Sequence, residues 1–95
     1  MYPIVEKREL SPSVKLFAVQ APAIAKKCQP GQFIILRIDE DGERIPLTIA
    51  DFNRQKGTIT LIFQEVGCST RHLGRLGAGD SLLDVAGPLG QATHI

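Results

Sequence analysis

The sequence predicts an all-β fold: a six-stranded antiparallel Greek-key barrel with one short helix. Short runs of β-branched and aromatic residues alternate with turn residues along nearly the whole chain. A single segment, after the most regular run, has helical spacing instead. With 95 residues the chain fits one small domain. A closed barrel is favoured because it leaves no strand edge exposed.

The first two strands are expected at residues 2–10 and 14–20. Residues 2–10 alternate loosely around Ile4 and stop at a Ser-Pro-Ser turn, and residues 14–20 are rich in β-formers up to Pro22. Residues 21–27 are compatible with a helical turn, but the segment is too short to predict one.

The middle of the chain predicts three more strands. Pro30-Gly31 is a strong turn signal, and the buried-looking strand 33–38 follows it. The polar turn 39–43 contains Asp-Gly, which favours a hairpin into the strand 45–50. After another turn, residues 58–63 alternate most cleanly of all.

The one predicted helix follows this clean strand. Ser69 or Thr70 is expected to cap it, and it runs to about Leu76. Leu73 and Leu76 have the i, i+3 spacing of an inward face. Two glycines end the helix, and residues 81–85 form the last expected strand.

Composition narrows the function classes. The formal net charge is +1, from 11 basic and 10 acidic residues, so no broad field attracts nucleic acid or anionic lipid. The apolar runs are far too short to span a bilayer, and no secretion signal is evident. The two cysteines are too few for a four-thiolate metal site. We therefore expect a cytoplasmic chain that binds neither nucleic acid, membrane nor metal.

The segment Gly67-Cys68-Ser69-Thr70 lies between a strand and the helix. Free backbone N–H groups at a helix start, together with two hydroxyls, suit an anion. The glycine lets the backbone approach a phosphate closely. The alternative is that Ser69 or Thr70 is only an N-cap after a turn glycine.

The segment Arg44-Ile45-Pro46-Leu47-Thr48 opens a strand. The proline needs no ladder donor there, and its fixed φ stiffens a surface that could press against a flat ring. The Thr48 hydroxyl can bond a ring nitrogen, and Arg44 is long enough to reach a diphosphate. The alternative is that Arg44 is a solvated turn residue and Thr48 an ordinary β-former.

The end of the clean strand, Phe63-Gln64-Glu65, is the third feature. Phe63 is either a core residue or part of a site, and Gln64 is either a site residue or a solvated edge residue. Each feature is weak alone. Their order and spacing strengthen the case for a ligand site.

Together these segments resemble the N-terminal domain of the ferredoxin–NADP reductase superfamily. The closest similarity is to the branch that holds the dihydroorotate dehydrogenase electron-transfer subunit, the small subunit of NADH-dependent reduced ferredoxin–NADP oxidoreductase (sulfide dehydrogenase) and hydrogenase gamma subunits. The segments that carry the resemblance are 30–33, 44–49, 66–70 with Leu73, and 79–80 through 87–90.

The resemblance implies FAD bound across the open side of the barrel. Thr48 matches the hydroxyl position near the reactive flavin N5, and Leu47 matches the position of an aromatic that flanks the ring. Ile45 stands where the superfamily has an arginine that meets the diphosphate, a departure. Arg44 is one residue early and would point to the other face. The residues expected to bind FAD are Arg44, Ile45, Pro46, Leu47, Thr48, Ile62, Phe63, Gln64, Gly67, Ser69 and Thr70.

The resemblance also implies that residues 1–90 form the FAD-binding barrel and that 91–95 begin a linker to a nucleotide-binding domain. Relatives of this branch add a cysteine-rich tail for a [2Fe–2S] cluster and associate with a larger flavin or iron–sulfur subunit. The parent would be an NAD(P)-dependent flavoprotein oxidoreductase that passes electrons between a pyridine nucleotide and an iron–sulfur partner. Without the second domain, the chain could fail to retain FAD.

Two points stay open at the level of sequence. Cys68 matches a cysteine that lies near the nicotinamide in plant-type reductases, but we expect it to be a small residue packed under its loop. The alternative to the flavin module is a non-catalytic β-barrel used for binding or assembly.

Overall fold

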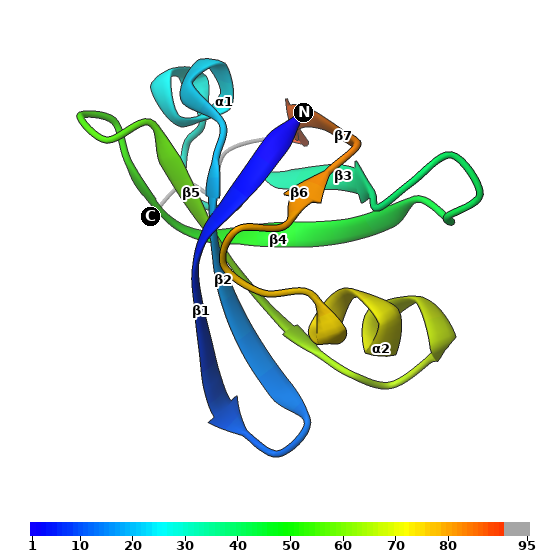
Figure 1. Cartoon of the computed structure of the whole chain (residues 1–95). Helices are drawn as coiled ribbons and strands as arrows, with labels where there is room; N and C mark the ends of the chain where they lie inside the picture. The colour runs from blue at the N-terminus through cyan, green and yellow to red at the C-terminus, as the bar shows by residue number, and fades with distance from the viewer. Residues whose placement is uncertain (91–95) are drawn as a thin grey trace.

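The computed structural model describes residues 1–90, which form seven strands and two helices (Figure 1). The linker expected at residues 91–95 lies outside the described residues. The strands are β1 (Tyr2–Ser11), β2 (Val14–Gln20), β3 (Phe33–Arg37), β4 (Ile45–Asn53), β5 (Thr58–Gln64), β6 (Ser81–Leu82) and β7 (Asp84–Leu89). The helices are α1 (Pro22–Lys27) and α2 (Cys68–Arg75).

The sheet closes through the last stretch of chain. The strand order is β6-β1-β2-β5-β4-β3-β7, and every pair is antiparallel. β6 and β7 are separated only by Leu83, whose N–H bonds the carbonyls of Arg37 and Ile38 at 3.1 and 3.2 Å. Because β6 pairs with β1 while β7 pairs with β3, one extended segment covers both edges of the sheet. The predicted all-β antiparallel barrel is confirmed.

Two details of the prediction were wrong. Seven strands replace the expected six, because the last segment breaks at Leu83 and then continues through Gly87-Pro88 to Leu89. Two helices replace the expected one. α1 forms because Pro22 presets φ at the first helical position and Ile24 and its neighbour are buried against the core.

The core fills the inside of the barrel. β2 and β5 bury alternate residues, so Phe17 and Leu61 are fully enclosed while Leu16 and Ile62 face outward. The Phe17 and Phe63 rings meet edge to face, with centroids 5.1 Å apart. Neither helix within residues 1–90 is long and apolar enough to cross a membrane.

Candidate functional site

β4 and β5 each carry exposed residues just beyond the end of their mutual pairing. Pro46 and Thr48 are exposed on β4, while Ile45 and Ile49 on either side of them are buried. The β4–β5 pairing ends at Ile49 and Leu61, and the next residues, Thr48 on β4 and Ile62 on β5, are both exposed. We call Pro46, Thr48, Ile62 and Gln64 the outer face. Ile62 is 41% exposed, a large apolar side chain left on this surface.

The start of α2 adjoins the end of the outer face. Gly67 is the N-cap, in an extended conformation, and Thr70 is the third helical residue. The Thr70 Oγ1 accepts hydrogen bonds from the N–H groups of Val66 and Gly67, both at 3.0 Å, and donates to the Gly67 carbonyl at 3.1 Å. The expectation that Ser69 or Thr70 is the N-cap was wrong. The helix begins earlier because the Thr70 side chain reaches back to satisfy the N–H groups ahead of it.

This helix start suits an anion. The first-turn N–H groups of Cys68, Ser69 and Thr70 precede any intrahelical acceptor, and the first turn has no acidic residue. The helix dipole adds partial positive charge at this end. A Cβ built on Gly67 would meet nothing within 4 Å, so there is open space beside the N-cap. A phosphate group fits this arrangement.

A cavity of about 200 Å³ lies between α2 and the loop that joins β3 to β4. Ile45, Cys68, Ser69 and His72 contribute to its lining, with Glu43 from the loop. The Ser69 hydroxyl donates to the Glu43 carboxylate at 2.8 Å. An anion that bonded this hydroxyl would have to displace Glu43, whereas the first-turn N–H groups need no such exchange.

Several predicted site residues support the surface from beneath. Ile45 and Phe63 are 7% and 4% exposed and belong to the core, so their side chains do not reach the outer face. Leu47 is half-buried and packs against the same core. Arg44 is exposed and precedes β4. Of the predicted residues, Pro46, Thr48, Ile62, Gln64 and Gly67 are exposed, and Ser69 and Thr70 are half-buried.

Cys68 corrects another expectation. It is exposed rather than packed under its loop, because it is the first helical residue, and it lines the cavity beside His72. The buried thiol is that of Cys28, and burial raises its pKa while the nearby Arg54 charge partly offsets the shift. Among residues 1–90, no group of three or more His, Cys, Asp and Glu side chains could hold a metal ion.

Sequence reasoning missed two residues at this site. Val66 is 70% exposed between the outer face and the helix start, where an apolar side chain offers contact area to a ligand. Its position just before Gly67 could have indicated from the sequence that Val66 lies at the site. Nothing in the sequence could have predicted the Glu43–Ser69 hydrogen bond, because it joins residues that are distant in sequence.

Comparison with known proteins identifies the family. The model of the oxidoreductase FAD-binding domain matches residues 1–94. The chain belongs to this family. It is 51% identical over 90 residues to an uncharacterized protein in the adh 3′ region of Clostridium beijerinckii, covering 95% of this chain and 30% of that protein. It is 40% identical over 92 residues to the dihydroorotate dehydrogenase B (NAD(+)) electron transfer subunit homolog of Thermotoga maritima, covering 97% and 33%.

Comparison with solved structures gives a consistent result. A chain of NADH-dependent reduced ferredoxin–NADP oxidoreductase, solved in work on flavin-based electron bifurcation, superposes with a TM-score of 0.96 and 38% identity over 99% of this chain and 34% of that one. The cytochrome b5 reductase domain of Ulva prolifera nitrate reductase, at 21% identity and a TM-score of 0.76 over 94% and 39%, shows the fold alone. The superfamily resemblance is confirmed. The chain spans about a third of the length of the first two relatives.

Proposed function

We propose that this domain binds FAD with the flavin ring on the outer face and the diphosphate at the start of α2. The observation that carries this proposal is that the exposed end of β5 leads directly into the start of α2. β5 ends at Gln64, Val66 is exposed next to it, and the free first-turn N–H groups follow directly after Gly67. A ligand with an aromatic ring and a diphosphate matches an apolar surface that leads into an anion site.

Each residue of the surface has a distinct proposed role. Pro46, Ile62 and Val66 give the ring an apolar surface, and the Thr48 hydroxyl bonds the ring near N5. The first-turn N–H groups of α2 bind the diphosphate, which Gly67 allows to approach closely. Arg44 is long enough to reach the diphosphate from the edge of β4. FAD, when bound, supplies the redox chemistry, while the chain binds it, orients it and excludes water.

We further propose that the longer protein is an NAD(P)-dependent flavoprotein oxidoreductase. Two named relatives support this proposal: an electron transfer subunit homolog of dihydroorotate dehydrogenase B and an NADH-dependent reduced ferredoxin–NADP oxidoreductase. Because this chain spans about a third of each, a nicotinamide domain, a [2Fe–2S] cluster and a larger flavin or iron–sulfur subunit would lie outside it. The cytoplasmic location stays a prediction, which cell fractionation tests.

The experiment is a titration with FAD and, separately, with riboflavin, which lacks the diphosphate. Visible absorbance and flavin fluorescence report binding to the chain and to a version extended past Ile95. Saturable binding with FAD preferred supports the proposal. If neither version binds either ligand, the flavin proposal fails and the alternative of a non-catalytic barrel module gains support.

A further inference from the structure

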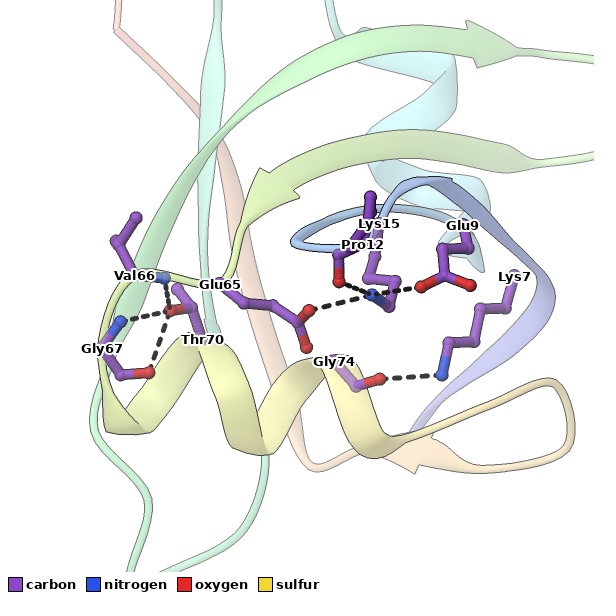
Figure 2. A network of polar contacts seen from close by, with 9 residues as sticks. All are labelled: Lys7, Glu9, Pro12, Lys15, Glu65, Val66, Gly67, Thr70 and Gly74. Carbon is purple, nitrogen blue, oxygen red and sulfur yellow. Dashed lines mark hydrogen bonds and ion pairs between the residues drawn. The ribbon is translucent and has the colours of Figure 1, made fainter.

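Apart from the Ser69–Glu43 hydrogen bond at its first turn, α2 is held to the barrel by one buried leucine and by a polar network toward its C-terminal end. Leu73 is fully buried. The network, shown in Figure 2, joins the β1–β2 hairpin, the β5–α2 connection and the last turn of the helix. Its members are Lys7 and Glu9 of β1, the Pro12 carbonyl in the turn, Lys15 of β2, Glu65 after β5, and Gly74 of α2.

Lys15 is the centre of the network. It is 8% exposed, the one charged or polar residue among residues 1–90 that is classed as buried. Its ammonium bonds Glu65 at 2.9 Å, the Pro12 carbonyl at 3.1 Å and Glu9 at 3.3 Å. All three donors of the ammonium therefore have acceptors. The backbone N–H of Glu65 also donates to the Ser13 carbonyl at 2.7 Å, so both ends of this residue are tied to the hairpin.

Gly74 brings the helix directly against Glu65. A Cβ at residue 74 would lie 2.6 Å from Cδ of Glu65, far inside van der Waals contact, so a side chain fits there only if the Glu65 carboxylate moves away. The Lys7 ammonium donates to the Gly74 carbonyl at 2.7 Å. This contact places a positive charge at the C-terminal end of α2, where the helix dipole is negative.

We propose that Lys15 and Glu65 are positioning residues, which fix α2 against the barrel and so set the diphosphate end of the FAD site. This inference rests on the proposed function. Glu65 immediately precedes Val66 and Gly67, and its carboxylate touches the helix at Gly74, so its placement fixes both the start of α2 and its last turn. Loss of Lys15 leaves two carboxylates without their shared cation, and the connection shifts to hydrate them.

A purely stabilising role for the pair makes a different prediction. General destabilisation lowers the folded fraction and weakens every ligand equally. A displaced α2 weakens only the ligand that uses the helix start. The ratio of FAD affinity to riboflavin affinity therefore separates the two roles, since riboflavin occupies the outer face without reaching α2.

The test compares Lys15→Met with Arg54→Met, in the chain and in the version extended past Ile95. Arg54→Met is the control, because it also removes a cation that bonds a backbone carbonyl, that of Cys28 at 2.9 Å, but at the end of α1 instead of α2. We expect Lys15→Met to weaken FAD binding about tenfold, about 1.4 kcal/mol, with riboflavin binding unchanged. Arg54→Met should leave the ratio at the wild-type value. If Lys15→Met does not fold, Glu65→Gln, which keeps the side-chain shape, gives the same comparison.

The outcomes are separable. A wild-type protein that shows no preference for FAD contradicts the proposed function. A wild-type preference that Lys15→Met or Glu65→Gln leaves intact contradicts the positioning role alone. A fall in the ratio that Arg54→Met shares also contradicts it, because the effect would then not depend on the contacts that fix α2.

Discussion

The two short helices lie at opposite parts of the barrel and are fixed in different ways (Figure 1). α1 is fixed by burial: Ile24 and Ala25 are enclosed, its C-cap residue Cys28 is fully buried, and Arg54 bonds the Cys28 carbonyl. α2 buries Leu73 and Gly74 and is otherwise tied by the polar network around Lys15 and by the Ser69–Glu43 hydrogen bond. α1 covers the core, and the residues at both of its ends, Ala21 and Cys28, are buried. α2 leaves the N–H groups of its first turn free, and most of its contacts lie toward its C-terminal end.

The largest loss of stability is expected when the buried apolar residue that anchors each helix is truncated. Leu73→Ala and Ile24→Ala should each lower the free energy of unfolding by about 3 kcal/mol, because each empties a buried site. Urea denaturation measures this loss. The comparison predicts that only Leu73→Ala also lowers the ratio of FAD to riboflavin affinity. Equal ratios in the two variants would remove the functional distinction between the helices.

Gly74→Ala tests how closely α2 approaches Glu65. In an ordinary helix this substitution stabilises by up to about 1 kcal/mol. Here the added Cβ overlaps the Glu65 side chain, which Lys15 holds in place. We expect the free energy of unfolding to fall by about 1–2 kcal/mol instead. An increase in stability would show that Glu65 moves aside easily and that the network does not fix the helix.

The architecture was predictable because each β-strand shows its alternation of apolar and polar residues in the local sequence. The contacts that attach α2 to the barrel join residues that are distant in sequence, so no local pattern predicts them. Residues 58–63 alternate regularly, and the structure has β5 there, with Ile59, Leu61 and Phe63 buried. The hydroxyls and glycine before α2 were identified from their order, but the true cap was missed because Thr70 bonds backward along the chain. The burial of Lys15 was not predicted. Its strand has apolar residues on both faces, so the pattern does not say which face is inward, and its partner Glu65 lies 50 residues away.

The Lys15 network predicts a pH dependence of its own, separate from that of the buried Cys28 thiol at the end of α1. The hydrogen bond to Glu65 raises the pKa of Lys15 above its ordinary value of 10.5, and Glu9 contributes in the same direction against the cost of burial. The folded state therefore holds this proton more tightly than the unfolded chain does. Its contribution to stability is complete below pH 10.5 and is lost as the pH rises through the folded-state pKa.

We expect the stability difference between wild type and Lys15→Met to be constant below pH 10.5 and to narrow above it. Denaturation of both proteins across this range measures the difference and cancels other alkaline titrations, including that of Cys28. The same series with Arg54→Met should show no narrowing. A gap that stayed constant at high pH would mean that the ammonium charge does not stabilise the network.

The smallest expected effect is on the rate at which a thiol reagent labels the two cysteines, one of which lies at an end of each helix. Cys28 ends α1 and is fully buried, with its pKa raised by burial, whereas Cys68 begins α2 and is exposed. A thiol reagent should label Cys68 in the folded protein and Cys28 only on unfolding, because attack requires an accessible thiolate. Cys68→Ser assigns the fast phase. FAD should slow the labelling of Cys68, since this residue lies in the first turn of α2 and lines the cavity. Unchanged labelling at saturating FAD would place the diphosphate away from the helix start, even in a protein that binds the flavin.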